Sequence, residues 1–453
     1  MVEFRVEYLS FVSLPVHPAE RAGYRAAAEV VGRLRGAGHL AYMVGGGVRD
    51  LVLGLPPKDF DIVTSSPPEE TQRLFRRSIP VGVQFGVVTV VHRGRTFEVA
   101  TFRAEGDYRD GRRPGWVNFA DLEADLARRD FTINGLVLDP EEERILDFCG
   151  GLADLRRGVV RTIGEPGVRF AEDALRMLRA VRFAARFGFR LDRAARRAIV
   201  AAARSIGRVA AERIWQELEA MWSHPTRSAA LVLLKETGLL EIVVPHVGAL
   251  ASGRGPWGPW ARTVRRVRAL PPDAPNEVAW ACLFADALCQ KEPATDQWDE
   301  DGPYDPSAVR EAEIIMADLR APRKLSRTVG ELLSRRWTWH RAHEMRYGSL
   351  ARLLRRDPEG HLLLFWRADA ASFGRAEAAR PLEDIAARLR ARGQMQDGPN
   401  QPPITGDDLL ARGLVAGPRF QELLAEAERE WLEGRLATRE EVNLWLSKAK
   451  SAL

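Results

Sequence analysis

The sequence predicts an α+β N-terminal domain, a mixed sheet with helices over residues 22–140, followed by an all-helical remainder. Strand-like segments alternate with helical segments as far as about residue 140 and then nearly vanish. From 141 onward, apolar residues recur at helical spacing. A chain of 453 residues also exceeds what one compact core accommodates, so we expect several domains.

Helices and strands alternate along the N-terminal domain. A helix over 18–38 stops at a glycine, and a short helix follows the glycine turn that begins at Gly45. A third helix begins near residue 66, with prolines in its first turn. Two alternating segments joined by a short link predict a hairpin. The expected strands are 40–44, 58–64, 86–94, 95–102 and 131–139.

Composition excludes several classes of protein. The net charge of +5 is mild, so a nucleic-acid surface would have to come from segregated charge. The cysteines Cys149, Cys282 and Cys289 form no C-x-x-C pair, which argues against a disulfide framework and a zinc site. The N-terminus is a poor signal peptide, and no run reaches the roughly 20 apolar residues of a membrane span. We therefore expect a soluble, cytoplasmic protein.

Two aspartates stand close together in the predicted strand "KDFDIVT". Residues i and i+2 of a strand point to one face, so Asp59 and Asp61 should converge, and a divalent cation would relieve their repulsion. Hard oxygen ligands suit Mg²⁺, and a pair of such ions can neutralise a pyrophosphate leaving group. Glu98 could add a third carboxylate from a neighbouring strand. The alternative is a set of solvated carboxylates on exposed strands.

The stretch "GGGVRD" precedes this strand and suits phosphate binding. Glycines such as Gly46 allow close backbone approach, and Arg49 could add a guanidinium to a triphosphate. At a later junction, "DLARRDFTING", Arg128 and Arg129 could hold a triphosphate or ribose, although a capping and salt-bridge cluster is the alternative. A phosphate cradle beside a metal-binding strand suits a nucleotidyltransferase.

The segment 168–189 predicts one amphipathic helix with an unusual charged stripe. The charged residues recur at intervals of three, whereas a solvated pair at that spacing contributes only about 0.2–0.5 kcal/mol. Stability is therefore a weak reason for the stripe, and a binding role is favoured. Its members are Asp173, Arg176, Arg179 and Arg182.

The sequence resembles the class II tRNA nucleotidyltransferases (CCA-adding enzymes) of the polymerase β nucleotidyltransferase superfamily, together with the related bacterial poly(A) polymerases. The resemblance covers residues 22–225 and continues weakly from "ITGDDLLARGL". It is carried, in order, by the blocks "GGGVRDLVLGLPPKDFDIVT", "EVATFR", "RRDFTING", "DFCGGLADL" and "RFAEDALRMLRAVRFAARFGF".

Proline, glycine and acidic residues over 251–325 predict loops or an insertion between helices. The resemblance implies a polymerase β-like head, a helical neck, a helical body that contains this region, and a helical tail that binds tRNA. The corresponding ranges are 22–140, 141–225, 226–403 and 404–453. It implies Mg²⁺-dependent addition of CMP and/or AMP from CTP and ATP to the 3′ end of tRNA, with body and tail holding the acceptor arm. Roles follow for the matched residues: catalytic metal ligands Asp59 and Asp61, nucleotide contacts Gly46, Arg49 and Arg129, base-reading Asp173 and Arg176, and assisting Arg179 and Arg182.

Several alternatives remain open at this point. The loop 103–125, which helps such enzymes change from C to A acceptance, is about one residue shorter than usual, so CC-adding and A-adding enzymes are alternatives. Poly(A) polymerases tend to carry Pro-Val where this chain has Ala174-Leu175. A phosphohydrolase of the His-Asp type is disfavoured because Ala285 precedes Asp286. A purely RNA-binding module would not need both metal carboxylates.

Overall fold

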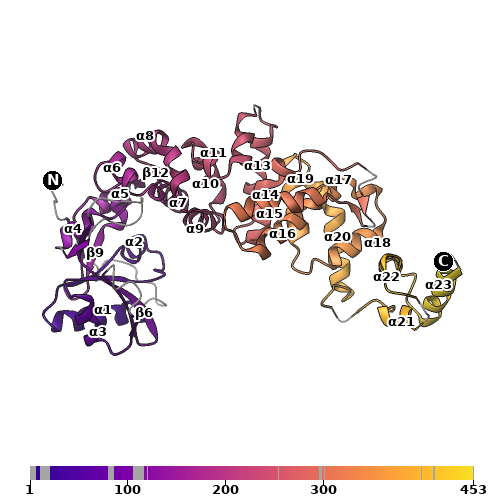
Figure 1. The fold of residues 1–453 in the computed structure, drawn as a ribbon, viewed down its shortest axis with the longest axis horizontal. Coiled ribbons are helices and arrows are strands. Elements are labelled where there is room, and N and C mark those ends of the chain that lie inside the picture. Colours follow the sequence, from indigo (N-terminus) through magenta and orange to yellow (C-terminus); the bar gives the residue numbers. More distant parts are fainter. Residues whose placement is uncertain are drawn as a thin grey trace. The chain divides into compact units, whose positions relative to one another are not determined.

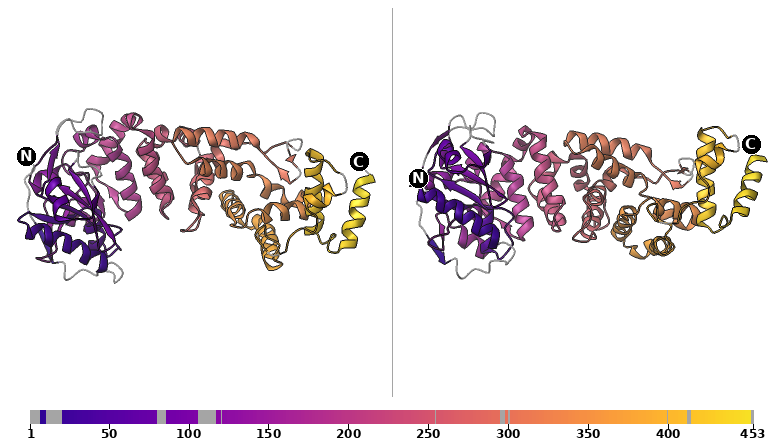
Figure 2. Two further views of the ribbon diagram at one scale, coloured as in Figure 1. Left: turned by 60° about the horizontal axis from the view of Figure 1, so that its bottom comes forward. Right: turned by 90° about the horizontal axis from the view of Figure 1, so that it is seen from below.

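The computed structural model describes residues 7–10, 21–79, 86–105, 117–119, 121–253, 255–294, 298–299, 301–398, 400–411 and 414–451. The chain forms two compact units. The first comprises Met1–Glu217 and Glu236–Val243, and the second comprises Leu218–Lys235 and Val244–Leu453. Strands gather in the first unit, whereas helices dominate the second (Figures 1 and 2). The predicted fold class is confirmed, and the division into head, neck, body and tail stays a prediction.

The first unit is built on a mixed, eight-stranded sheet in the order β1-β10-β9-β2-β3-β6-β5-β4. Strands β3 and β6 are parallel, and every other neighbouring pair is antiparallel. The strands are β1 (Glu7–Ser10), β2 (Ala41–Val44), β3 (Asp61–Thr64), β4 (Ser78–Ile79), β5 (Val87–His92), β6 (Arg95–Thr101), β9 (Leu136–Asp139) and β10 (Arg144–Asp147).

Helices cover this sheet and close its core. Helix α1 (Arg21–Gly36) contacts β2, β3 and β6, and helix α3 (Pro68–Leu74) contacts β5 and β6. The two helices also contact each other. Helix α2 (Gly46–Val52) contacts β2 and β9. Apolar residues from the strands and from the helix α4 (Leu122–Ala127) meet in one core cluster. Its buried members are Val44, Val63, Phe102, Leu126 and Val137.

The structure corrects three of the expected elements and contains strands that were not expected. Strand β3 begins only at Asp61, so Asp59 lies in the preceding loop. The single helix expected over 168–189 is divided into α6 (Pro166–Glu172) and α7 (Leu175–Phe187). A 3₁₀ turn at Thr132–Asn134 replaces the start of the last expected strand. Strands β1 and β10 were not expected, because short strands become recognisable only through the partners with which they pair.

Further short elements complete the first unit. The predicted loop 103–125 is described only in part, since 106–116 and 120 lie outside the described residues, but β7 pairs with β8 across it. Strands β11 and β12 form a parallel pair. The remaining elements up to residue 222 are β7 (Arg103–Glu105), β8 (Val117–Phe119), α5 (Gly151–Arg157), β11 (Val159–Val160), β12 (Arg190–Leu191), α8 (Arg193–Ala202) and α9 (Ala211–Trp222), whose last residues belong to the second unit.

The region 251–325, interpreted from sequence as loop-rich, contains three substantial helices. Helix α14 is buried along almost its whole length, so this region supplies part of the core of the second unit. The α-helices after α9 are α10 (Arg227–Glu236), α11 (Leu240–Val243), α12 (Pro245–Gly248), α13 (Pro259–Arg268), α14 (Asn276–Leu288), α15 (Pro306–Asp318), α16 (Arg323–Ser334), α17 (Thr338–Arg341), α18 (Tyr347–Arg355), α19 (His361–Ser372), α20 (Arg380–Ala391), α21 (Gly406–Leu410), α22 (Pro418–Leu432) and α23 (Arg439–Ser451). Strand β13 (Trp298–Asp299) pairs antiparallel with β14 (Gly302–Pro303). In the part of the chain described here, none of the helices combines the length and the apolarity needed to cross a membrane.

A buried ionic cluster lies inside the second unit and consists of Arg266, Arg336, Asp286 and Asp369. All four side chains are at most 2% exposed. Burial alone would raise the pKa of Asp286, but Arg266 and Arg336 hold it well below its usual range. Asp286, the residue weighed as half of a His-Asp pair, is thus bound to arginines.

Candidate functional site

The pocket of the first unit forms where β2 ends and β3 begins. These antiparallel strands pair Val44 with Asp61, so the glycine turn after β2 lies beside the aspartate that starts β3. Gly45 has a φ of 81°, in the left-handed region that favours glycine. A Cβ atom at Gly45 would lie 3.5 Å from Asp61 Oδ2 and 3.4 Å from a terminal nitrogen of Arg129. The turn, the aspartate and the arginine are therefore close neighbours.

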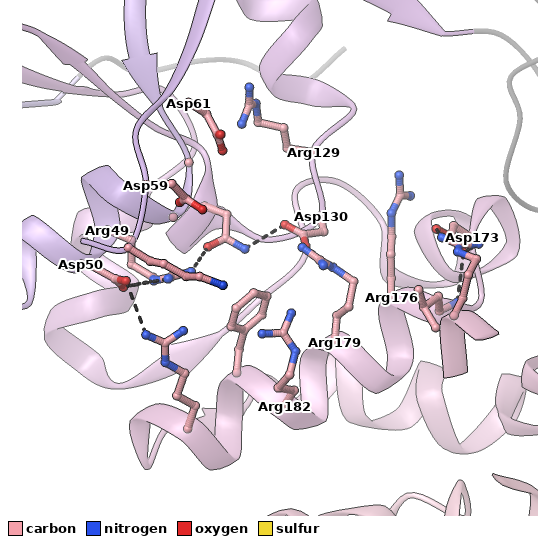
Figure 3. Close-up of a pocket in the computed structure, with 18 residues that line it drawn as sticks. Arg49, Asp50, Asp59, Asp61, Arg129, Asp130, Asp173, Arg176, Arg179 and Arg182 are labelled. Atoms are coloured by element: carbon pink, nitrogen blue, oxygen red, sulfur yellow. Dashed lines mark hydrogen bonds and ion pairs between the residues drawn. The ribbon is translucent and has the colours of Figure 1, made fainter. Parts of the chain in front are cut away.

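The cavity has a volume of about 610 Å³ and collects charged side chains from distant parts of the sequence. Asp59 and Asp61 lie at one side with Arg129 near Asp61, and Asp173 lies at the other (Figure 3). All the predicted site residues except Glu98 line it. The lining comprises Gly45, Gly46, Arg49, Asp50, Lys58, Asp59, Asp61, Arg129, Asp130, Asn134, Asp173, Leu175, Arg176, Arg179, Arg182, Phe183, Arg186 and Arg213.

Asp59 and Asp61 bring an excess of negative charge to one side of the pocket. The prediction that both stand on one strand face is wrong, because Asp59 lies in the loop before β3, yet both line the pocket. Burial raises the pKa of Asp61 to about 6, helped by the carboxylates of Asp59 and Glu98 and opposed by Arg129. A cation would relieve this repulsion, and two carboxylates are the hard donors that a divalent metal ion takes.

Glu98 lies close enough to influence Asp61 but does not line the pocket. It is exposed on β6, next to Val99, which pairs with Ile62 of β3. Among the described residues, no group of three or more His, Cys, Asp or Glu side chains is placed to hold a metal ion. The assignment of Glu98 as a metal ligand stays a prediction.

The third glycine of the turn, Gly47, holds the loop that carries Asp59. A Cβ atom there would fall on the Asp59 carbonyl oxygen, well inside van der Waals contact, and 3.3 Å from the Phe60 ring. Only glycine therefore allows α2 and this loop to pack so closely. Sequence reasoning did not single out Gly47, because the contact is visible only once the two segments are together.

Arg49 connects three parts of the site. It is only 3% exposed, its Nε donates to Asp50 at 2.8 Å, and a terminal nitrogen donates to Asn134 Oδ1 at 2.6 Å. Its guanidinium also stacks over Phe187 of α7, 4.8 Å from the ring centre. Asn134 was not singled out from the sequence, although it stands in the "RRDFTING" block.

For the two arginines before the 3₁₀ turn, the sequence left open whether they bind a ligand or form a salt-bridge cluster. Arg128 and Arg129 bind the buried carboxylate of Asp125 at 2.6 Å and 3.1 Å, but only Arg129 lines the pocket. Burial would raise the pKa of Asp130, but Arg179, the Asn134 amide and the Phe131 N–H lower it to about 2. Asp130 is therefore a charged anchor for Arg179 of α7.

The charged stripe is only partly helical. Arg176, Arg179 and Arg182 extend from α7 into the pocket, whereas Asp173 stands before the helix in an extended conformation. Asp173 Oδ1 accepts from the N–H of Leu175, the first residue of α7, at 3.1 Å, and Arg213 binds the same carboxylate. The prediction that Asp173 continues a helical stripe is wrong, because this aspartate interrupts the helix.

Arg176 is almost fully buried and bonds with its own surroundings. One terminal nitrogen donates to Glu172 at 2.6 Å and to the Arg169 carbonyl at 3.0 Å. The other donates to the Arg128 carbonyl at 3.2 Å. A guanidinium has five N–H donors, so donors remain for a group entering the pocket.

Known families and proteins match this chain in the region of the pocket. Residues 41–161 match the family described as Poly A polymerase head domain, and 188–250 match the one described as Probable RNA and SrmB-binding site of polymerase A. The CCA-adding enzyme of Geobacillus thermodenitrificans (strain NG80-2) is 42% identical over 270 residues, which are 59% of this chain and 64% of that enzyme. Over these regions the chain is similar to the poly(A) polymerase head and RNA-binding families and to CCA-adding enzymes.

Further CCA-adding enzymes are similar to this chain in sequence or in fold. The CCA-adding enzyme of Geobacillus stearothermophilus is 46% identical over 217 residues, 48% of this chain and 54% of that enzyme. The crystal structure of the Bacillus stearothermophilus CCA-adding enzyme in complex with CTP has a TM-score of 0.74 at 29% identity, covering 95% of this chain and 98% of that one. The Thermotoga maritima CCA-adding enzyme complexed with tRNA shares the fold, with a TM-score of 0.65 at 18% identity, covering 98% and 99%. By sequence, the chain spans between half and two thirds of the curated relatives named here.

Proposed function

We propose that the chain adds CMP and AMP, taken from CTP and ATP, to the 3′ end of tRNA without a nucleic-acid template and with release of pyrophosphate. The observation that carries this proposal is one pocket with Asp59 and Asp61 at one side, Arg176 and Asp173 at the other, and Arg179 and Arg182 between them (Figure 3). Nucleotidyl transfer needs a place for phosphate chemistry and a place that recognises the base. The kinship with CCA-adding enzymes, one of them solved with CTP, supports this assignment.

Asp59 and Asp61 would hold divalent metal ions, for which Mg²⁺ is the natural choice with hard carboxylate donors. When bound there, such ions stabilise the charge on the reacting phosphates and favour ionisation of the terminal hydroxyl of the RNA. Arg129, Arg179 and Arg182 would bind the phosphates through their planar donors. Asp125, Asp130 and Glu217 bind these arginines and so fix their positions.

Replacing Gly47 by alanine should lower the rate of nucleotide addition about 100-fold, the size expected when reacting groups move by about 1 Å. The added methyl group would displace the Asp59 carbonyl and with it a metal carboxylate. Gly36→Ala is the matched control, because nothing lies within 4 Å of its Cβ position. Rates of labelled CTP incorporation check the prediction, and equal rates for G47A and G36A would contradict it.

The base would be selected by Asp173 and Arg176. Cytosine and adenine each present an amino donor beside a ring nitrogen acceptor, so a carboxylate can accept from either base and a guanidinium can donate to either. Uracil and guanine present a carbonyl oxygen instead, and each buried polar group left unpaired costs about 1–3 kcal/mol. Both side chains line the pocket and keep hydrogen-bonding capacity for such a contact.

Asp173→Ala or Arg176→Ala should therefore relax discrimination and admit UTP or GTP relative to CTP and ATP. The measurement is the ratio of kcat/KM values for the four nucleotides with one tRNA. Circular dichroism establishes that each variant is folded. If both folded variants keep the nucleotide preference of the original protein, these positions do not read the base.

The helical part of the chain, including the proposed tail 404–453, would bind the acceptor arm of tRNA through shape and phosphates. Duplex RNA offers a protein mainly its phosphates, its 2′-hydroxyls and its shape. Binding of tRNA should therefore weaken with added salt and depend little on tRNA sequence.

The proposed function is tested by incubating the protein with tRNAs that lack the last three, two or one nucleotides of the CCA end. CTP, ATP and Mg²⁺ are supplied, and the products are sized. Completion of all three substrates identifies CCA addition, whereas completion of a subset identifies a CC-adding or A-adding enzyme. Long runs of A identify a poly(A) polymerase. The absence of metal-dependent addition to any tRNA would refute the proposal.

A further inference from the structure

Helix α9 places two opposite charges behind the pocket. Arg213 and Glu217 stand four residues apart and so share one face of the helix. Each binds a pocket residue of opposite charge: Arg213 binds Asp173 at 2.7 Å, and Glu217 binds Arg182 at 2.6 Å. Neither was singled out from the sequence.

Arg213 holds Asp173 with a two-pronged contact. One terminal nitrogen donates to Oδ1 at 3.2 Å and the other donates to Oδ2 at 2.7 Å. A planar guanidinium that binds both oxygens fixes the plane of the carboxylate, which a single-point cation cannot do. Arg213 also lines the pocket itself.

The hydrogen bonds of Asp173 leave a restricted capacity for a base. Each carboxylate oxygen offers about two acceptor positions. Oδ1 accepts from the Leu175 N–H and from Arg213, whereas Oδ2 accepts from Arg213 in the contacts described. The remaining position is on Oδ2, and its direction is set by the plane that Arg213 imposes. An acceptor in a fixed position binds a base that presents an amino donor there and repels a base that presents a carbonyl oxygen.

We propose that Arg213 is a positioning residue for nucleotide choice, acting by holding Asp173 as an acceptor with one orientation. Without Arg213 the carboxylate can rotate away from the base or admit a water molecule that bridges to a carbonyl of uracil or guanine. Asp173 would then stay in the pocket and lose its selectivity. This inference rests on the proposed function, because it concerns the same pocket and the same reaction.

The experiment measures kcat/KM for CTP and UTP on one tRNA in the original protein and in Arg213→Gln, Arg213→Lys and Arg208→Gln. Arg208 is exposed and does not line the pocket. Because R208Q removes one positive charge just as R213Q does, it is the matched control. R213Q should raise the use of UTP relative to CTP about tenfold, the effect of misdirecting one buried acceptor. For R213K, the use of UTP relative to CTP should lie between the values for the original protein and R213Q, because lysine keeps the charge but not the two-pronged contact.

A second comparison separates positioning from a general structural role. In the Asp173→Ala background, R213Q should change discrimination no further, because its effect passes through Asp173. The inference is overturned if folded R213Q keeps the original preference, if R213K restores it fully, or if R213Q still changes it in the Asp173→Ala background. Failure of the original protein to add any nucleotide would instead refute the proposed function.

Discussion

Asp59→Ala and Asp61→Ala should each lower nucleotide addition at least ~10³-fold while leaving tRNA binding nearly unchanged, since tenfold in rate corresponds to about 1.4 kcal/mol and metal-assisted charge stabilisation is worth several kcal/mol. Both carboxylates line the pocket, and Asp61 already carries the repulsion of its neighbours. Labelled CTP incorporation measures the first effect, and filter binding of tRNA measures the second.

Two further variants make this test specific. Asp59→Asn and Asp61→Asn keep the side-chain shape and remove the charge, so a matching loss identifies charge as the cause. Glu69→Gln is the control, because Glu69 is exposed on α3 and lies outside the pocket lining. Substantial metal-dependent activity in the alanine variant of either aspartate would show that it is dispensable as a metal ligand.

Arg336→Met should destabilise the second unit by about 3–5 kcal/mol, the cost of removing one partner from a buried ion pair. Arg336 binds Asp286 at 2.8 Å and Asp369 at 3.1 Å, and its third nitrogen donates to the Ala285 and Cys289 carbonyls. Its removal leaves Asp369 with Arg266 alone and Asp286 with Arg262 and Arg266, and it takes a donor from both carbonyl groups. Urea unfolding followed by tryptophan fluorescence measures the free energy of unfolding.

The control for Arg336 is Arg327→Met on α16. Arg327 pairs with Glu331, but both side chains are largely exposed, at 74% and 58%. Exposed ion pairs contribute less than about 1 kcal/mol, so the free energy of unfolding of this variant should be close to that of the original protein. If R336M and R327M shift the unfolding midpoint equally, the buried ionic cluster does not stabilise the unit in the way described.

The parts of the fold that depend on local sequence were predictable. The glycine turn, the hairpin of β5 and β6 and the helical C-terminal part all follow from patterns within a few residues. Asp59, Asp61 and the arginines of α7 also stand in local motifs, and they all line the pocket.

The features that were missed depend on distant contacts. Helical spacing continues across Asp173, but this residue is extended between α6 and α7 and binds Arg213, which is 40 positions away in the sequence. Asn134 has a role only because it meets Arg49, and Gly47 only because it meets the Asp59 loop. Among the described strands, β1 pairs only with β10, which lies more than 130 residues further along the chain. None of these partners can be read from a pattern along one segment.

The two aspartates of the pocket are held by different parts of the molecule. Asp61 takes its position from the ladder between β2 and β3, where a one-residue slip would turn every side chain to the other face. Asp59 takes its position from a loop that rests on Gly47. A designer who altered the length of the segment 55–58 would therefore move one oxygen donor and leave the other in place. The separation of the two carboxylates would then be adjustable without rebuilding the sheet, and with it the size of the ion that the proposed site would accept.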